Sequence, residues 1–351
     1  MDISFWLTTP VDLSDGLDRP LGGAEVSAVQ LATELAKTNT VYIYCNTAKK
    51  YTERNMVMFP YNEIQQHELD TLIVVRAHEI LNTRIRAWFK KRPRILINWS
   101  GDAYDQPNNA IFGDKWLCDH MDGFVTKSKW QRETLNTMYP NLINKTKVIY
   151  NGVDDSLFPD APTVDENKFI WASTWYRGLD QMPEIWKRIK TELPDAHLKV
   201  YAKTSLYMDG NQDIQAKALF AALESLDSVT VHDPVPQREL INELATAKLL
   251  LYPNAHFMES SCGVVQQSIC AGTPVITSAR AGLPETVSTE GFAISHNPGT
   301  EEYYTSFTEK VLKLCRDQKL YNRLSRQGLL RRTGESWNQV ARKWTRYLES
   351  L

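Results

Sequence analysis

The sequence predicts an α/β protein made of two doubly wound domains that face a cleft. The chain has 351 residues, of which 42% are hydrophobic and 23% charged, enough for about two globular domains with cores of their own. Short apolar or β-branched runs alternate with helical patterns along the whole chain, which indicates parallel sheets covered by helices. Such sheets bind ligands outside the carboxyl ends of their strands, so two facing sheets would enclose a cleft.

The first domain is predicted over residues 1–152. Its strands are the apolar runs at residues 3–7, 41–44, 56–59, 72–75, 95–98, 124–126 and 148–150. Between the first two runs, apolar residues recur near helical spacing from Val26 to Ala36, which predicts a helix over residues 24–37. Two sets of six or seven strands suit two sheets better than one very large sheet.

The second domain is predicted over residues 153–335. It follows the turn at Asn151-Gly152 and opens on a stretch rich in proline and aspartate, residues 158–165, which has the composition of a linker. Its strands are the runs at residues 169–172, 198–201, 229–231, 249–252, 274–277 and 292–294. The last segment, residues 336–351, is predicted to be a helix, because large apolar residues recur there at helical spacing.

Charge and composition exclude several classes of protein. The net charge is only −2, whereas proteins that neutralise many nucleic-acid phosphates usually carry a basic excess, so nucleic acid is an unfavoured partner. No run of about 18 apolar residues predicts a membrane-spanning helix, and the amino-terminus lacks a signal-peptide pattern; peripheral membrane contact stays open. The five cysteines are odd in number and lack metal-ligand spacing, so we expect reduced thiols in a cytoplasmic protein.

A pair of glycines is the first feature that carries chemistry. The segment Leu21-Gly22-Gly23-Ala24-Glu25 follows the first predicted strand and opens a helix. Paired glycines let backbone N–H groups approach an anion, and the start of a helix adds positive potential. A Gly-Gly pair is a weak signal by itself, so a phosphate site and an ordinary flexible loop are equal alternatives here.

Arg177 is the second such feature. It follows the strand predicted at residues 169–172 and precedes a helical pattern. An arginine at the carboxyl end of a parallel strand can hold a diphosphate through its planar fork of donors. It would then stabilise the negative charge that develops on a departing nucleoside diphosphate. The alternative is a solvated surface arginine, which is the commoner fate of a single arginine.

The most informative segment spans residues 259–277 and follows the buried strand predicted at residues 249–252. A loop of small residues that leads into a helix presents free N–H groups to phosphate. At the start of this loop, the carboxylate of Glu259 can accept hydrogen bonds from sugar hydroxyls, and Gln267 can reach ribose hydroxyls from the helix. The alternative is that both are ordinary surface residues.

With these segments in view, the chain resembles the retaining nucleotide-sugar glycosyltransferases of the GT-B fold, specifically glycosyltransferase family 4 (glycosyl transferases group 1). The matching segments are Gly22-Gly23-x-Glu25, His78 in Val75-Arg-Ala-His, Ser128 in Lys127-Ser-Lys-Trp, Asn151-Gly-Val-Asp, Arg177-Gly-Leu-Asp, Pro236-Gln-Arg-Glu-Leu, the Glu259 segment up to Ala271-Gly-Thr-Pro-Val, and Ala281-Gly-Leu-Pro-Glu-Thr-Val. They run in family order over nearly the whole chain. The resemblance implies two Rossmann-like domains, the first on the acceptor side and the second for the nucleotide sugar, with the helix at 336–351 packing back on the first.

The resemblance also assigns roles to residues. The expected catalytic residues are Arg177, which neutralises the diphosphate, and Glu259, which contacts the transferred sugar. The expected donor-binding residues are Gly22, Gly23, Arg177, Lys203, Val235, Ser261, Cys262, Gly263, Val264 and Gln267. For the acceptor we expect Glu25, Asp102 and Tyr104, from their positions near strand ends.

Three positions depart from the family pattern. The second acid of the pattern is replaced by Gln267, a weaker acceptor that adds a donor, so donor affinity or nucleotide preference would differ. A family histidine that helps to position the donor sugar is absent, and its role is vacant or passes to Asp102. One of the two basic residues usual near Arg177 is also missing, and Lys203 is a candidate to compensate.

The implied reaction is a metal-independent, retaining transfer from a nucleotide-diphosphate sugar, a co-substrate, to a carbohydrate or other hydroxyl acceptor; no further cofactor is expected. No Asp-x-Asp pair marks a metal site. Two alternatives stay open. One is a GT-B enzyme that modifies a DNA base; a local basic cluster favours it, formed by Lys127, Lys129 and Arg132. The other is a catalytically degenerate nucleotide-binding scaffold, which the three departures from the family pattern favour.

Overall fold

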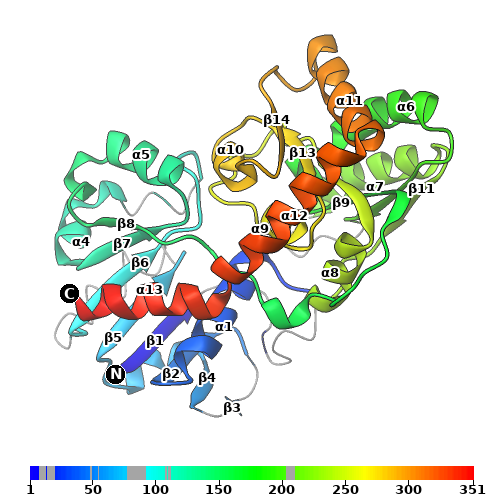
Figure 1. The fold of residues 1–351 in the computed structure, drawn as a ribbon. Helices are drawn as coiled ribbons and strands as arrows, with labels where there is room; N and C mark the ends of the chain where they lie inside the picture. The colour runs from blue at the N-terminus through cyan, green and yellow to red at the C-terminus, as the bar shows by residue number, and fades with distance from the viewer. Residues whose placement is uncertain are drawn as a thin grey trace. The chain divides into compact units, whose positions relative to one another are not determined.

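The computed structural model describes residues 1–7, 13, 20–47, 50–53, 55–76, 92–106, 109, 112–202 and 210–351. Their contacts divide the chain into two compact units. The first unit comprises Met1–Gly152 together with Glu335–Leu351, and the second is Val153–Gly334. Each unit is built on one mostly parallel sheet with helices packed against it (Figure 1).

The sheet of the first unit has eight strands within the described residues, in the order β3-β4-β2-β1-β5-β6-β7-β8. All neighbours pair in parallel except β3 and β4. The strands are β1 (Asp2–Leu7), β2 (Thr40–Cys45), β3 (Tyr51–Glu53), β4 (Met56–Pro60), β5 (Thr71–Val75), β6 (Ile95–Trp99), β7 (Gly123–Thr126) and β8 (Thr146–Val148). The strand order reverses direction at β1 and β5, so the carboxyl ends of these two strands mark the topological switch point where ligands bind in such sheets.

Two apolar cores cover the two faces of this sheet. Because side chains alternate along a strand, Phe5 and Leu7 of β1 join one core, whereas Trp6 between them points the other way and joins the second. Within the described residues of this unit, the helices are α1 (Gly23–Leu35), α4 (Lys115–His120), α5 (Lys129–Met138) and α13 (Trp337–Glu349), with 3-10 turns η1 (Tyr61–Gln66) and η5 (Pro140–Leu142).

Helix α13, the last element of the chain, belongs to the first core. It lies beside α1 (Figure 1), and its Trp344 packs edge-on against Trp99 of β6 with ring centroids 5.2 Å apart. The helix begins after Ser336, whose hydroxyl accepts a hydrogen bond from the backbone N–H of Gln339, the usual role of a serine N-cap.

The sheet of the second unit has six parallel strands within the described residues, in the order β11-β10-β9-β12-β13-β14. They are β9 (Asp165–Ala172), β10 (His197–Tyr201), β11 (Val229–His232), β12 (Ala247–Tyr252), β13 (Val275–Ser278) and β14 (Gly291–Ile294). The order reverses at β9 and β12, which makes their carboxyl ends the switch point of this unit.

The helices of the second unit enclose its sheet in one continuous core. They are α6 (Met182–Glu192), α7 (Gly210–Glu224), α8 (Gln237–Ala245), α9 (Gly263–Cys270), α10 (Leu283–Val287), α11 (Glu301–Arg316) and α12 (Gln318–Gly334), with 3-10 turns η6 (Asp155–Leu157), η7 (Trp175–Arg177) and η8 (Leu179–Gln181). Among the described helices of both units, none has the length and apolar character needed to span a membrane.

The strands of the first unit differ from the prediction at both edges of the sheet. The prediction of a strand at residues 148–150 is wrong by two residues, because β8 begins at Thr146, and Thr146 and Lys147 are polar residues on an edge strand that show no apolar run. Ile149 only donates one backbone hydrogen bond to Thr126, 2.9 Å long. The short antiparallel strand β3 was not predicted, so the first sheet has one strand more than expected.

Candidate functional site

The switch point of the second unit brings Arg177 and Glu259 together. Arg177 lies in η7, after β9, and Glu259 lies in the loop after β12. The Arg177 Nη1 donates to Glu259 Oε1 over 2.7 Å, with side-chain exposures of 26% and 4%. The Arg177 guanidinium also lies over the ring of Phe257, 4.3 Å from its centroid. The two residues expected to be catalytic are therefore in direct contact.

A glycine with a left-handed backbone shapes the turn that carries Arg177. Gly178 has a φ of +113°, and a Cβ at this position would come within 2.1 Å of the backbone oxygen of Pro253. Only glycine tolerates both the positive φ and this approach of two backbones. The turn after β9 can thus pack directly on the loop after β12, which brings Arg177 to Glu259.

The carboxylate of Glu259 is held from a second side. The phenol of Tyr252, the last residue of β12, donates to Glu259 Oε1 over 2.7 Å. The backbone is fixed as well, because Gly282 N–H donates to the Glu259 backbone oxygen over 2.8 Å. A Cβ at Gly282 would come within 2.4 Å of the Ser260 oxygen, so this glycine permits the close approach.

Burial and charge shift the pKa values of this cluster. Burial pulls the pKa of Arg177 down, but the neighbouring groups, Glu259 foremost, raise it well above the ordinary value. Burial raises the pKa of Tyr252 well above its usual range, and raises that of the Cys262 thiol to about 12, with Glu259 adding to both. The arginine is therefore cationic, and Cys262 is a neutral thiol that lacks the thiolate character of a nucleophile.

Helix α9 begins next to this cluster. Its N-cap is Cys262, whose side chain makes no capping hydrogen bond. The first N–H groups of a helix have no partner within it, and they carry the positive end of the helix dipole. A Cβ at Gly263 would meet nothing within 4 Å, and Ser261, Gly263 and Val264 are each partly exposed. The start of α9 therefore offers backbone donors at an accessible surface.

Buried polar atoms without hydrogen-bond partners gather at the same sheet edge. Within the described residues, these include Thr174 Oγ1, Arg177 Nε, both side-chain polar atoms of Asn254, and Arg280 Nε. The four residues follow β9, β12 and β13, and Asn254 is fully buried. Buried polar groups in proteins are almost always hydrogen-bonded, so a set of exceptions at one edge calls for an explanation such as a bound polar ligand.

The other predicted donor-binding residues of this unit lie farther along. Gln267 is partly buried in α9, and its Nε2 donates to Gln237 Oε1 of α8 over 2.6 Å. Val235 is partly buried between β11 and α8, after His232, whose ring stacks on Tyr201 at 5.0 Å. Lys203 lies outside the described residues. The roles of these residues stay predictions.

In the first unit, the predicted glycine pair opens helix α1. Gly22 is the N-cap, and a Cβ at the exposed Gly23 would meet nothing within 4 Å. Glu25, in the first turn of α1, is only 1% exposed. Gly23 thus leaves room for a ligand at the helix start, while the carboxyl of Glu25 is enclosed by protein.

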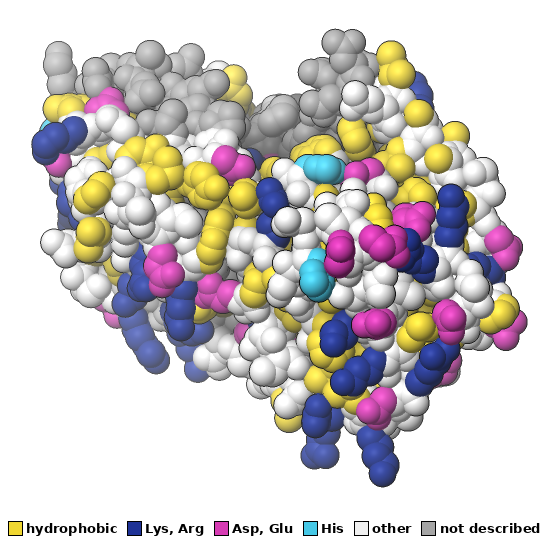
Figure 2. Space-filling view, turned by 90° about the horizontal axis from the view of Figure 1, so that it is seen from above, with side chains coloured by type: hydrophobic (Ala, Val, Ile, Leu, Met, Phe, Trp, Pro, Cys, Tyr) yellow, Lys and Arg dark blue, Asp and Glu magenta, His cyan; other side chains and the backbone are white. Residues whose placement is uncertain are grey.

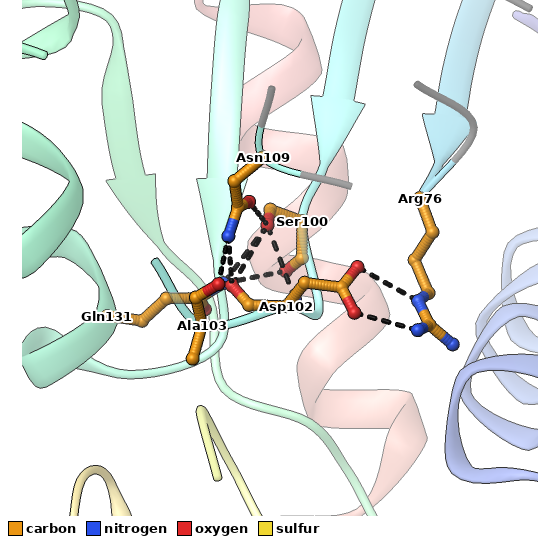
Figure 3. Close-up of polar contacts among 6 residues, drawn as sticks. All are labelled: Arg76, Ser100, Asp102, Ala103, Asn109 and Gln131. Carbon is orange, nitrogen blue, oxygen red and sulfur yellow. Dashed lines mark hydrogen bonds and ion pairs between the residues drawn. The ribbon is translucent and has the colours of Figure 1, made fainter. Parts of the chain in front are cut away.

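Asp102 is part of a bonded network at the carboxyl end of β6 (Figure 3). Its two carboxylate oxygens accept hydrogen bonds of 2.9 and 2.7 Å from Nε and Nη2 of Arg76, which follows β5. The buried Gln131 donates to the backbone oxygen of Asp102 over 2.8 Å, and Asn109 donates to the backbone oxygens of Asp102 and Ala103. This network fixes the turn that follows β6.

Tyr104 and two of the matched motif residues, His78 and Ser128, also belong to the first unit. Tyr104 is half-buried, with its ring 6.1 Å from that of Trp130. His78 lies outside the described residues, and Ser128 caps α5 by accepting from the N–H of Gln131. In the described part of the chain, no group of three or more His, Cys, Asp or Glu side chains could hold a metal ion.

Sequence reasoning missed Arg76, Tyr252, Phe257 and Asn254 as members of the two sites. Arg76 and Asn254 do follow predicted strands, and this position was the available signal. Tyr252 and Phe257 read as ordinary apolar residues, and only the fold shows that the Tyr252 phenol reaches a buried carboxylate.

Comparisons of the sequence with known proteins find similarity to glycosyltransferases. Residues 166–331 match the sequence model of the family described as glycosyl transferases group 1. YtcC of Bacillus subtilis strain 168, whose name describes a glycosyltransferase, is 21% identical over 267 residues; these cover 70% of this chain but only 64% of YtcC, less than two thirds of its length.

Solved structures share the fold over the full length. Sucrose-phosphate synthase from Thermosynechococcus elongatus has a TM-score of 0.78 at 13% identity and covers 99% of this chain and 98% of its own. The Anabaena protein Alr3699/HepE, solved in complex with UDP-glucose, has a TM-score of 0.76 at 14% identity and covers 100% of both chains. The predicted fold, two Rossmann-like α/β domains, is confirmed.

Proposed function

We propose that this protein transfers a sugar from a nucleotide-diphosphate donor to a hydroxyl acceptor with retention of configuration, because residues 166–331 match the glycosyl transferases group 1 model and the chain has the GT-B fold. The observation that carries the proposal is the contact between Arg177 and Glu259 beside the start of α9, at the switch point of the second unit. Alr3699/HepE, a structural neighbour, was solved with UDP-glucose, which supports a nucleotide sugar as the donor here.

Arg177 and helix α9 stabilise the negative charge of the leaving group. As the bond to the sugar breaks, negative charge accumulates on the departing nucleoside diphosphate. A guanidinium that is already cationic and fixed by Glu259, together with the N–H groups at the start of α9, stabilises this charge without rearrangement. The unpartnered Nε–H of Arg177 and the amide of Asn254 are further donors for the ligand.

Glu259 orients the transferred sugar. Its carboxylate shares one oxygen with Arg177 and Tyr252, and a carboxylate has about four acceptor sites, so it retains capacity for sugar hydroxyls. The departing phosphate accepts the proton of the attacking hydroxyl, and the protein supplies no covalent nucleophile. The neutral thiol of Cys262 is consistent with this route.

Donor turnover tests the role of Glu259. Release of nucleoside diphosphate from a panel of nucleotide sugars, with water as the default acceptor, is measured for the wild type, Glu259→Gln and the control Glu192→Gln, which breaks a surface ion pair with Arg316. We expect a loss of about 100-fold in kcat for Glu259→Gln and no change for the control. Near-normal turnover of Glu259→Gln removes the assigned role, and binding of a nucleotide without any turnover favours the degenerate scaffold.

The alternative of a DNA-modifying enzyme finds little support in the surface charge. Figure 2 shows Lys and Arg side chains interspersed with Asp and Glu over much of the visible face. Of the basic cluster, Lys127 is buried, so only Lys129 and Arg132 offer charge to a phosphate backbone. Duplex DNA binding that weakens steeply with salt would revive this alternative.

A further inference from the structure

Four charged side chains converge at the switch point of the first unit. They are Glu25 in α1, Arg76 after β5, Asp102 after β6 and Lys127 after β7. Three of them are almost fully buried: Glu25 is 1% exposed, Asp102 2% and Lys127 5%. Burying a charge is costly unless direct partners compensate it, so the pairing within this cluster shows whether a partner is missing.

Lys127 is the member whose charge lacks a direct partner. Arg76 and Asp102 form a two-bonded ion pair, so both Asp102 oxygens are engaged (Figure 3). In the described part of the chain, the Lys127 ammonium forms no hydrogen bond or ion pair; it lies over the Trp99 ring, 5.1 Å from its centroid. A Cβ on Gly101 would come within 3.1 Å of the Lys127 Nζ, so the absence of a side chain at Gly101 leaves space for the ammonium group.

The nearby carboxylates of Asp102 and Glu25 do not offset the effect of burial on the Lys127 ammonium. Burial, and after it the charge of Arg76, lower the pKa of Lys127 to about 8, although Asp102 and Glu25 act in the opposite direction. The two cations thus repel each other, and Lys127 itself is shielded from water. An anion placed between them would relieve both the repulsion and the loss of hydration.

The backbone around the cluster is also arranged as in a ligand site. Arg76 has a φ of +59°, a left-handed conformation that is unfavourable for a non-glycine residue and is concentrated at functional sites. Helix α1 starts at the same sheet edge, because it follows β1, the other strand of the switch point. Its first turn begins with Gly23, beside which a Cβ would find open space.

We propose that Lys127 binds an oxyanion of the acceptor, a carboxylate or a phosphate, assisted by Arg76 and the start of α1. This inference rests on the proposed function, in which Arg177 and α9 of the second unit bind the diphosphate of the donor. The cation of the first unit is then available to the other substrate. The acceptor belongs to the class of acidic or phosphorylated hydroxyl compounds.

The first experiment follows Lys127 itself by NMR in the full chain labelled with ¹³C at lysine Cε, with the Lys127 signal assigned from its loss in Lys127→Met. Sulfate is the probe, because its charge stays constant through the titration, and chloride at matched ionic strength is the reference. We expect the pKa of Lys127 to rise when sulfate is added, since a bound anion favours the charged amine. The same pKa in sulfate and chloride overturns the proposal.

The second experiment separates a ligand role from a structural one. The variant Lys127→Met keeps the length of the side chain, and the control Lys129→Met removes the same charge from an exposed position two residues later. We expect sulfate affinity to fall about tenfold or more in Lys127→Met only. We expect the thermal stability of Lys127→Met to stay the same or rise, because the buried charge has no direct partner to lose. Unchanged sulfate affinity in a folded Lys127→Met contradicts the proposal.

Competition identifies the source and the kind of the anion. UDP at saturation leaves sulfate at Lys127 if the site serves the acceptor, whereas displacement of sulfate by UDP assigns the site to the donor and overturns the proposal. Inorganic phosphate and acetate, titrated in place of sulfate, distinguish phosphate from carboxylate by the larger rise of the Lys127 pKa. A chain that binds no nucleotide refutes the proposed function, while the lysine titration still decides whether the anion site exists.

Discussion

At the scale of single residues, the candidate site depends on backbone conformations as much as on charged side chains. Arg177 reaches Glu259 because Gly178 adopts a φ of +113° and lets its turn approach Pro253. A sequence shows that a glycine is present, but not whether its φ is positive, so this contact could not be predicted although both partners were.

The substitution Gly178→Ala tests this dependence. The added Cβ meets the Pro253 oxygen at 2.1 Å in an already unfavourable φ region. We expect the free energy of unfolding of the second unit in urea to fall by more than about 2 kcal/mol, and nucleotide binding to weaken with it.

Gly263→Ala is the matched control for that variant. A Cβ there meets nothing within 4 Å, and the residue is in the first turn of α9. We expect its unfolding free energy to stay within about 0.5 kcal/mol of the wild type. Equal destabilisation by the two substitutions would mean that the close packing at Gly178 is not what holds the turn.

Lys127 offers a pH test at the same scale. Burial lowers its pKa to about 8 in the folded chain, whereas the unfolded chain keeps the higher ordinary value. The unfolded chain therefore binds more protons between these two values, so the stability of the wild type rises with pH through this window. We expect Lys127→Met to be more stable than the wild type by about 1 kcal/mol or more near pH 7, and the difference to shrink above pH 8. A difference between the two proteins that does not vary with pH would contradict the buried, unpaired charge.

At the scale of secondary-structure elements, buried central strands were predictable and edge strands were not. β12 is buried at all six residues, and residues 249–252 within it form a continuous apolar run. β8, at the edge, is partly exposed throughout, and β3 pairs with one neighbour only, so neither leaves a clear apolar pattern. Both edges of the first sheet lie away from its own switch point, which is why these errors did not displace the predicted site residues there.

The packing of helix α13 predicts how the stability of the first unit responds to a substitution in that helix. Trp344 is fully buried and contacts Trp99, so the last helix fills part of the core of the first unit. We expect Trp344→Ala to destabilise the first unit by about 3–5 kcal/mol, measured by hydrogen exchange of β1 and β6 amides, with β9 and β12 protected as before.

The control for that helix is Lys343→Ala, which changes the exposed neighbour and leaves the packing intact. We expect its exchange pattern to match the wild type. Loss of protection in both units on Trp344→Ala would show that the units do not unfold separately.

At the scale of the whole molecule, each unit carries its polar cluster at the switch point of its own sheet. The strand order explains why residues far apart in sequence meet: Arg177 and Glu259 follow β9 and β12, which are neighbours in the sheet but separated by two strands in the chain. Motif order together with the strand–helix alternation predicted this arrangement. The orphaned amide of Asn254 and the buried Lys127 could not be predicted, because burial and missing partners depend on packing from several elements.

The most direct test of the central claim is isothermal titration of UDP into the wild type, Arg177→Ala and Arg316→Ala, a variant that removes an exposed arginine of the same unit. We expect Arg177→Ala to bind UDP about 10- to 100-fold more weakly, because it loses charge-assisted hydrogen bonds to the diphosphate, and Arg316→Ala to bind like the wild type. Equal affinities in all three proteins would contradict a diphosphate site at Arg177.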